Sequence, residues 1–264
     1  MSNRTLRFLD EKLTAGQAGL TSREVRERLG LSPQAASNLL TRWREVGLVD
    51  RVAPGHYAIR QLGLLGTRAA SEDVALAVGA FFAGEPHRIA YRSALDCHGL
   101  LTHPARTIQV ACPREVTVKE LSGRPLRTII ESRETVLVGA VQAGHGARVS
   151  GLERSLLDGA ARMDLIGGAN VLAEALSTAQ LDPAMLQSLA QEIGAATALR
   201  RLGSLADQLP IPALANRLQP LATPTSDIQL EPQHPATGKR PFRDRKWRVV
   251  WAQPPATIAE GLEQ

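Results

Sequence analysis

The sequence predicts an α+β protein in which an N-terminal winged helix-turn-helix precedes a larger mixed α/β domain. Residues 21–60 follow the order helix, tight turn, helix and two-stranded wing. From residue 107 the apolar residues alternate along short segments, and a helical period returns at residue 151. We therefore expect a winged helix-turn-helix over residues 1–62, a linker over 63–71, an α/β domain over 72–255 and a flexible tail over 256–264.

The helix-turn-helix is predicted from its capping residues. Thr21 is a suitable N-cap, and Glu24 three residues later completes a capping box. Gly30 ends this first helix, because glycine accepts the left-handed backbone of a helix exit. Ser32 then caps a second helix that has Pro33 in its first position, where a missing N–H costs nothing. Two short strands, 48–52 and 57–60, are expected to form the wing.

The second helix has one apolar side and one polar side. At 100° per residue its six apolar residues, including Leu40 and Trp43, share one face, and uncharged hydrogen-bonding residues lie opposite with arginines beside them. Amides and hydroxyls suit base edges, and guanidinium groups suit phosphates, so this face predicts DNA binding. Glu45 lies on the same face and argues against it. The alternative is a small helical subdomain that binds protein.

The candidate DNA contacts of this module include the start of its first helix, where free N–H groups attract phosphate. They are Thr21, Ser22, Arg23, Gln34, Ser37, Asn38, Thr41, Arg42, Arg44, Arg51 and His56. The net charge of the chain is +5, and residues 1–60 alone hold ten basic and six acidic residues. Most of the excess charge therefore lies in the winged module, which favours a polyanionic partner. A second basic cluster near the C-terminus adds Lys239, Arg240, Arg243 and Arg245 as candidates.

The remaining elements are predicted from the period of the apolar residues. A supporting helix is expected over residues 3–13 with Leu6, Leu9 and Leu13 directed inward. Further helices are expected at 72–82, 89–101, 151–163, 168–179, 183–192 and 196–209. Strands are expected at 107–111, 116–119, 127–131 and 136–142, with one late strand over 247–251.

Several function classes are disfavoured by what the sequence lacks. Two cysteines form no disulfide framework, the N-terminal residues have no signal-peptide pattern and no apolar run is long enough for a membrane span, so a cytoplasmic protein is expected. The set Cys97, His98, His103 and Cys112 lacks compact ligand spacing, so we expect no metal and no cofactor. With no phosphate-binding glycine motif and no nucleophile–base pair, we expect no enzyme.

Five segments, in the same order, resemble the AbiEi-type antitoxin family, the regulator half of AbiE-like toxin–antitoxin operons. They are YRSALDCHGL at 91–100, IQVACP at 108–113, VSGLERSLLDGA at 149–160, RRLGSLADQL at 200–209 and RKWRVVWAQPP at 245–255. Ser155 departs from the family's threonine in the third segment. The N-terminal winged helix-turn-helix is similar to the opening module of that family.

The resemblance implies an antitoxin that counteracts a nucleotidyltransferase-type toxin and represses its own operon by binding inverted repeats in the promoter. It also implies that the C-terminal domain carries antitoxicity and helps DNA binding through a basic surface. No dimer face is evident, so we expect a monomer that pairs on DNA.

One alternative is a ligand-responsive winged-helix transcription factor without a toxin partner. Another is a nuclease-like domain that uses Glu131 or Asp158. Arg154 and Asp158 are alternatively an i,i+4 ion pair on one helix.

Overall fold

A computed structural model of the chain describes residues 3–60, 73–209, 214, 217–235 and 241–262. These residues divide into two compact units. The first comprises Met1–Ile89, Arg106–Leu137 and Val141–Val149, and the second comprises Ala90–Ala105, Val138–Ala140 and Ser150–Gln264. The predicted linker over 63–71 lies outside the described residues. The predicted boundaries at 62 and 72 remain a prediction, because the compact units divide the chain at other places.

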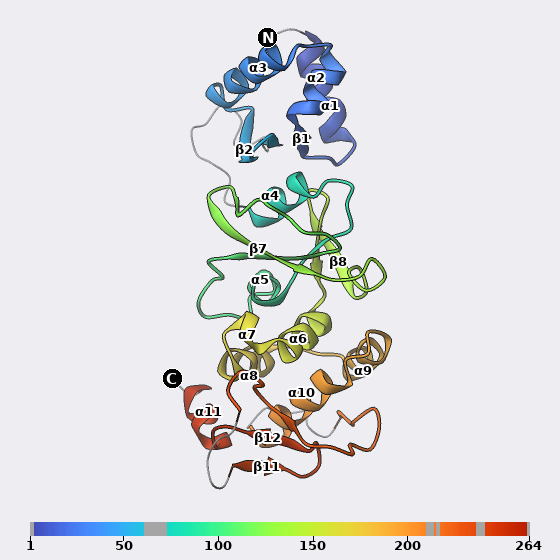
Figure 1. Cartoon of the computed structure of the whole chain (residues 1–264), viewed down its shortest axis with the longest axis vertical. Coiled ribbons are helices and arrows are strands. Elements are labelled where there is room, and N and C mark those ends of the chain that lie inside the picture. Colours follow the sequence, from blue (N-terminus) through green and yellow to red (C-terminus); the bar gives the residue numbers. More distant parts are fainter. Residues whose placement is uncertain (1–2, 61–72, 210–213, 215–216, 236–240, 263–264) are drawn as a thin grey trace. The chain divides into compact units, whose positions relative to one another are not determined.

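The winged module begins the first unit and has the predicted order of elements (Figure 1). Its elements are α1 (Asn3–Thr14), β1 (Gly19–Thr21), α2 (Ser22–Leu29), α3 (Pro33–Glu45), β2 (Val49–Ala53) and β3 (His56–Ile59). The predicted caps at Thr21, Gly30 and Ser32 are confirmed, but the capping box is not closed by Glu24, whose carboxylate accepts from Lys12 Nζ at 2.8 Å. The Glu24 N–H donates to Thr21 Oγ1 at 3.1 Å, the Ala35 N–H donates to Ser32 Oγ at 3.2 Å, and Gly30 has a φ of 67°.

Two details of this module differ from the sequence-based prediction. The wing has three strands in the order β1-β3-β2, because Gly19–Thr21 pairs antiparallel with β3 before α2 begins. The prediction of the inward face of α1 is wrong for two residues, since Leu6 and Leu13 are 50% and 40% exposed. Phe8 and Leu9 are buried in the core of the module instead. The buried face of α1 is therefore centred on Thr5, Phe8 and Leu9.

The first unit also contains a six-stranded mixed sheet with the strand order β6-β7-β5-β4-β9-β8. Its strands are β4 (Arg88–Ile89), β5 (Ile108–Cys112), β6 (Glu120–Leu121), β7 (Arg124–Ile130), β8 (Ala140–Gly144) and β9 (Ala147–Ser150), of which Ala140 and Ser150 belong to the second unit. Helix α4 (Val74–Phe81), capped by Asp73, packs against the wing strands. This packing is close, because a Cβ on Gly19 would lie 2.5 Å from Ala80 Cα.

Several predicted elements of this region need correction. The start of the predicted helix 89–101 is strand β4, and α5 covers only Tyr91–Cys97. The strand predicted at 116–119 is found at Glu120–Leu121. The strand predicted at 136–142 begins only at Ala140, because Ser132 turns the chain before it. Its Oγ accepts the Thr135 N–H at 3.2 Å, and its carbonyl accepts the Val136 N–H at 3.0 Å. Strand β9 was not predicted.

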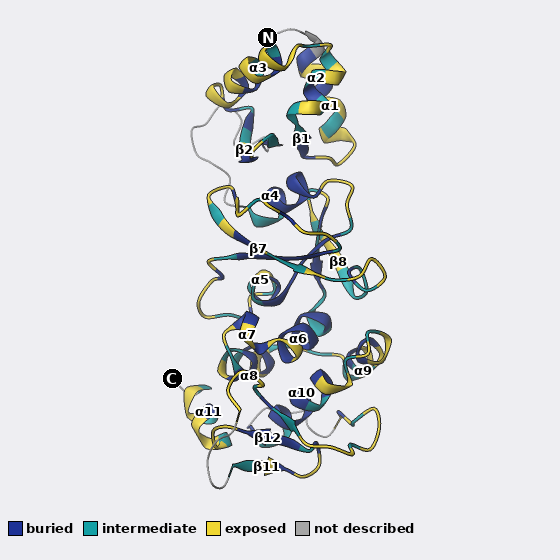
Figure 2. Ribbon diagram, viewed as in Figure 1, coloured by how far each residue is buried: buried dark blue, intermediate teal, exposed yellow. Residues whose placement is uncertain are grey.

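The second unit is mainly helical around a small C-terminal sheet. Its helices are α5, α6 (Leu152–Ala161), α7 (Met163–Ile166), α8 (Ala169–Thr178), α9 (Pro183–Glu192), α10 (Ala196–Gln208) and α11 (Pro255–Leu262). The sheet has the order β10-β12-β11, formed by Ile228–Gln229, Val249–Trp251 and Phe242–Asp244, where the sequence predicted one strand. Figure 2 shows α6 and α10 largely buried and α3 of the first unit largely exposed.

The C-terminal residues differ from the flexible tail predicted over 256–264. Residues 255–262 form helix α11, which packs against α8 and buries Ile258 to 3% exposure. Ile258 supplies the apolar anchor that the weak helical pattern of this segment did not reveal. The expectation of a flexible tail is therefore corrected up to Leu262.

His87 gives the first unit an expected sensitivity to acid. Its ring is 3% exposed, it stacks on Phe82 at a centroid distance of 5.2 Å, and its Nδ1 donates to the Glu85 carbonyl at 2.8 Å. Burial lowers the pKa of His87, and the charge of Arg148 lowers it further, although the bond to Glu85 acts in the opposite direction. As the pH falls below about 6.5, the imidazole of His87 therefore stays neutral in the folded protein, whereas it takes up a proton in the unfolded chain.

The sign of this effect makes the protein less stable as the pH falls. Below about pH 6.5 the free energy of unfolding is expected to fall by up to about 1.4 kcal/mol per pH unit from this group, until His87 protonates in the folded state as well. Urea unfolding of His87→Phe between pH 7.5 and 5 is expected to show a shallower fall than the wild type. His234→Gln, which changes an exposed histidine, serves as the control. Identical pH profiles for wild type and His87→Phe would refute this assignment.

Candidate nucleic-acid interface

Helix α3 presents the polar face that the sequence predicts. Ala36, Leu40 and Trp43 are 2% exposed or less and pack into the core of the winged module. On the opposite side Gln34, Ser37, Asn38 and Thr41 are all exposed. The Gln34 Nε2 donates to Asn38 Oδ1 at 3.0 Å, so the two amides orient one another on the surface. This face offers four adjacent uncharged hydrogen-bonding side chains, which is the chemistry that reads base edges in a groove.

The predicted arginine contacts flank this face. Arg42 and Arg44 are exposed on α3, and Arg51 is exposed on β2. Arg23 is also exposed, but its Nε donates to Glu27 Oε1 at 2.7 Å. The hydrogen bond to Glu27 raises the pKa of Arg23, and it offsets part of the charge that Arg23 would bring to a phosphate. The arginines of α3 and β2 are therefore the stronger phosphate candidates.

Other predicted DNA contacts form hydrogen bonds or ring contacts within the first unit itself. Thr21 Oγ1 accepts the Glu24 N–H, and the Ser22 N–H donates to the Gly55 carbonyl at 2.9 Å. The His56 ring lies 4.7 Å from the Phe81 ring, and its Nδ1 donates to the Pro54 carbonyl at 2.9 Å. These contacts fix the start of α2 and the tip of the wing.

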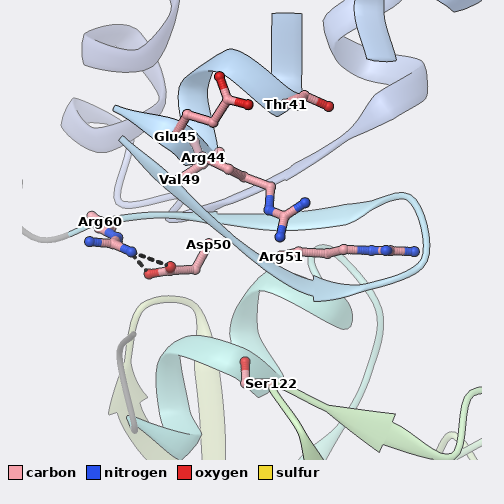
Figure 3. A pocket seen from close by; sticks show the side chains of 8 residues that line it. All are labelled: Thr41, Arg44, Glu45, Val49, Asp50, Arg51, Arg60 and Ser122. Atoms are coloured by element: carbon pink, nitrogen blue, oxygen red, sulfur yellow. Dashed lines mark hydrogen bonds and ion pairs between the residues drawn. The ribbon is translucent and has the colours of Figure 1, made fainter. Parts of the chain in front are cut away.

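A cavity lies beside α3 in the first unit (Figure 3). It has a volume of about 460 Å³, and it is lined by residues of α3, β2 and the β6–β7 hairpin. Arg44 and Arg51 both line it, and Ser122 lines it from the hairpin tip. Arg60, which follows β3, binds Asp50 with two bonds of 2.9 and 2.7 Å on the same wall.

The C-terminal basic cluster is more nearly neutral than its sequence suggests. Arg243 and Arg248 both bind Asp227, at 2.6 and 2.8 Å, and Lys246 binds Asp207 at 2.6 Å. The hydrogen bond from Arg248 is the main cause that lowers the pKa of Asp227. Arg245 is exposed. Lys239 and Arg240 lie outside the described residues. Sequence reasoning missed the two carboxylates, because Asp207 and Asp227 lie far from the basic cluster along the chain.

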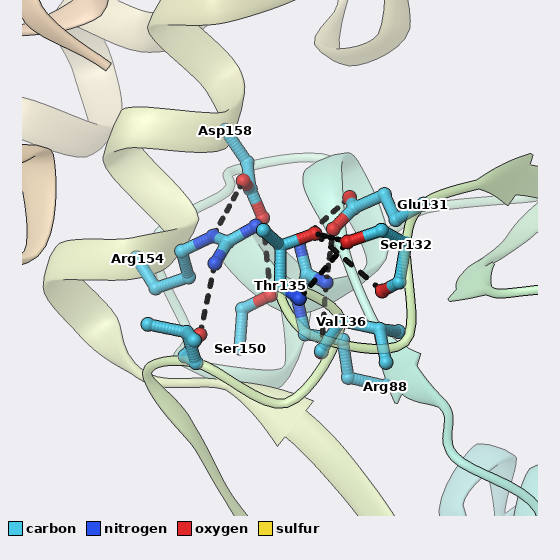
Figure 4. Close-up of polar contacts among 9 residues, drawn as sticks. Arg88, Glu131, Ser132, Thr135, Val136, Ser150, Arg154 and Asp158 are labelled. Atoms are coloured by element: carbon cyan, nitrogen blue, oxygen red, sulfur yellow. Dashed lines mark hydrogen bonds and ion pairs between the residues drawn. The ribbon is translucent and has the colours of Figure 1, made fainter. Parts of the chain in front are cut away.

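Glu131 and Asp158, the two carboxylates that a nuclease-like domain would use, each form an ion pair with a buried arginine (Figure 4). In the first unit Arg88, whose side chain is fully buried, binds both oxygens of Glu131 at 2.7 and 2.9 Å and the Val136 carbonyl at 2.9 Å. In the second unit Arg154 donates to Asp158 at 2.8 Å, so the predicted i,i+4 ion pair is confirmed. Both carboxylates are held by arginine, so these ion pairs stabilise the fold, and the pairing does not favour the nuclease alternative.

Among the residues that the structure describes, no group of three or more His, Cys, Asp and Glu side chains could hold a metal ion. Cys97 is exposed and Cys112 is buried, and neither forms a disulfide. No helix in the described ranges has the length and apolar character needed to cross a membrane.

Two family models match separate parts of the chain. Residues 4–56 match the model of the MarR family, and residues 88–208 match the model of the AbiEi antitoxin C-terminal domain. The chain carries an AbiEi antitoxin C-terminal domain behind a MarR-family DNA-binding domain. The predicted resemblance is thereby confirmed, and its N-terminal module is of the MarR type. None of the curated proteins matches this chain.

A solved structure has the same fold as the whole chain. The crystal structure of the RV2827C protein from Mycobacterium tuberculosis is similar over 100% of this chain and 96% of that one, with a TM-score of 0.66 at 18% sequence identity. At this identity the likeness concerns the fold alone. It agrees with the predicted class, a winged helix-turn-helix followed by a mixed α/β domain.

The RRLG segment of the AbiEi domain anchors the C-terminal sheet. Arg200 donates to the carbonyls of Trp247, Ser226 and Arg248 at 2.7 to 3.0 Å. Arg201, which is 7% exposed, donates to the Gln229 carbonyl at 3.0 Å and the Ala160 carbonyl at 2.8 Å.

Gly203 and Asp244 complete this anchor. A Cβ on Gly203 would lie 2.2 Å from the ring of Trp247, so only glycine leaves room for that ring. Asp244 accepts the Ser204 hydroxyl at 2.8 Å and the N–H of Lys246 at 3.0 Å. This segment of the AbiEi domain therefore joins α10 to the last strands of the chain.

Proposed function

We propose that the protein is an antitoxin that counteracts a nucleotidyltransferase-type toxin and represses its own operon by binding inverted repeats in the promoter. The pairing of a MarR-family DNA-binding domain with an AbiEi antitoxin domain supports both parts of this proposal. The exposed polar face of α3, with Gln34, Ser37, Asn38 and Thr41, carries the DNA-binding part. The protein acts in the cytoplasm without enzymatic activity of its own, and it is a monomer that pairs on the two halves of an inverted repeat.

In this proposal α3 enters the major groove of the promoter. Gln34, Ser37, Asn38 and Thr41 contact base edges, and Asn38 is the central reader because an amide makes two bonds to adenine. Arg42, Arg44 and Arg51 contact phosphates and add affinity that depends on salt. The same recognition face argues against the alternative of a helical subdomain that binds protein, because a DNA groove needs polar donors and acceptors rather than apolar contacts.

Mobility shifts on the DNA upstream of the gene test this assignment. Wild type is expected to bind that DNA more tightly than a scrambled duplex, and Asn38→Ala is expected to lose about 1–3 kcal/mol of this preference. Arg42→Ala should weaken binding to both duplexes and reduce the slope of log affinity against log salt by about 1. Arg133→Ala removes an equal charge from an exposed position outside the winged module and serves as the control.

The outcome that would contradict the proposal is an absence of preference by the wild type at every salt concentration. Equal effects of Arg42→Ala and Arg133→Ala would instead show that the charge of α3 has no special place in binding. A gene for a nucleotidyltransferase beside this one separates the proposal from a ligand-responsive transcription factor, because only an antitoxin needs such a neighbour.

A further inference from the structure

The cavity beside α3 has an unusual distribution of charge. Two guanidinium groups, those of Arg44 and Arg51, line it. Neither has an ion pair or a side-chain hydrogen bond to any residue that the structure describes. The third arginine on its wall, Arg60, is bound by Asp50 through two oxygens, so those two charges offset one another. The remaining charged group on the lining is the carboxylate of Glu45.

The directions of the Arg44 and Glu45 side chains make the cavity more basic than its lining residues alone would indicate. In Figure 3 Arg44 extends from α3 toward the aliphatic part of Arg51, whose guanidinium group lies farther off, whereas the Glu45 carboxylate points another way. Arg44 and Arg51 are both exposed, so solvent screens their mutual repulsion, and the two positive charges attract an anion to this wall. Guanidinium groups also match the oxygens of a phosphate with paired donors. The cavity therefore favours an anion with several oxygens.

Ser122 supplies an uncharged donor at the opposite wall. It forms the tip of the β6–β7 hairpin with Gly123, and its φ of 50° is left-handed, which is unfavourable for a residue with a side chain. Its N–H donates to the Val52 carbonyl at 2.9 Å, so the hairpin tip is fixed to the wing. Backbone strain that persists in this way gathers at binding sites. A serine here places a hydroxyl on the cavity wall that glycine would not provide.

We propose that this cavity binds a phosphate group, with Arg44 and Arg51 as its charged donors and the Ser122 hydroxyl as its neutral donor. The group can come from the backbone of bound DNA or from a free phosphorylated small molecule, since the volume of about 460 Å³ is within the range of small-ligand sites. The DNA source rests on the proposed function, and the free source does not. In either case the phosphate contacts the recognition helix, the wing and the hairpin at once. Phosphate binding and DNA binding therefore affect one another.

The first arm of the test uses the full chain without DNA. Inorganic phosphate and pyrophosphate are titrated calorimetrically at constant ionic strength set with chloride. If the source is free, wild type binds, and Arg44→Gln and Arg51→Gln each weaken binding by about tenfold or more. Ser122→Gly weakens it while its melting temperature stays at or above that of the wild type, because glycine adopts a φ of 50° without strain. Arg133→Gln leaves binding unchanged.

The second arm measures affinity for duplex DNA with the same variants in phosphate-free buffer. If the source is the DNA backbone, Arg51→Gln and Ser122→Gly lower affinity and Arg133→Gln does not. The proposal is overturned if the three cavity variants match Arg133→Gln in both arms. A wild-type chain that binds no duplex at all defeats the proposed function, whereas the first arm still decides the phosphate site.

Discussion

Gly203→Ala is expected to lower the free energy of unfolding by about 3 kcal/mol, because it forces a methyl group into the ring of Trp247. The new Cβ would lie 2.2 Å from Cζ2 and 2.3 Å from Cη2 of that ring. The ring cannot move away easily, since Trp247 is fully buried and its Nε1 donates to Asp207 Oδ2 at 2.5 Å. Urea unfolding followed by circular dichroism measures the change.

The matched control for this variant is Gly261→Ala in helix α11. Both glycines lie in helices, but a Cβ on Gly261 meets nothing within 4 Å. Its replacement should leave stability unchanged or raise it by up to about 1 kcal/mol through helix propensity. The double variant Gly203→Ala/Trp247→Leu should be less destabilised than the sum of its two single variants, because the smaller side chain leaves room for the methyl group. Equal effects of Gly203→Ala and Gly261→Ala would contradict the close contact.

Arg154→Met is expected to cost about 3–5 kcal/mol of unfolding free energy, because it leaves a buried carboxylate without its cation. The side chains of Arg154 and Asp158 are 4% and 6% exposed. Arg154 also donates to the Val138 carbonyl at 2.9 Å, and Asp158 accepts the Ser150 hydroxyl at 3.3 Å. The midpoint of urea unfolding is the measurement.

A double variant separates the buried pair from simple loss of packing. Arg154→Met/Asp158→Leu removes both charges, and it is expected to recover much of the stability that Arg154→Met loses. Arg7→Met breaks the exposed i,i+4 pair with Glu11, in which Arg7 is 81% exposed, and it should leave the midpoint unchanged. If the double variant is no more stable than Arg154→Met, burial of the charge is not the reason for the loss.

The local parts of the fold were predictable from the sequence. The helix boundaries at Thr21, Gly30 and Ser32 follow from the side chains that cap them, and the inward and outward faces of α3 follow from a period of 3.6 residues. The exposed candidates Asn38 and Arg42 are found where this period places them. These features depend on residues within a few positions of one another.

Features that depend on distant residues were not predictable in the same way. Strand β4 exists because Ile89 pairs with Val110 and Val149, and nothing within 89–101 reveals those partners. The neutralisation of the basic cluster by Asp207 and Asp227 requires contacts over 16 to 39 positions. The cavity beside α3 needs Ser122, which lies between the strands that the sequence predicted at 116–119 and 127–131 and far along the chain from α3. The ion pair of Arg154 was predicted, but its burial was not.

Rescue of growth from the toxin is the measurement that tests the account most directly. A nucleotidyltransferase-type gene found beside this one would be induced in cells that express this chain from a separate plasmid and promoter. Wild type and Asn38→Ala are both expected to restore growth, because our proposal assigns DNA binding to the recognition helix and antitoxicity to the AbiEi domain. Gly203→Ala should restore growth less well than wild type, because its loss of stability lowers the amount of folded AbiEi domain. Growth arrest that persists with wild-type protein at full expression would contradict the antitoxin function.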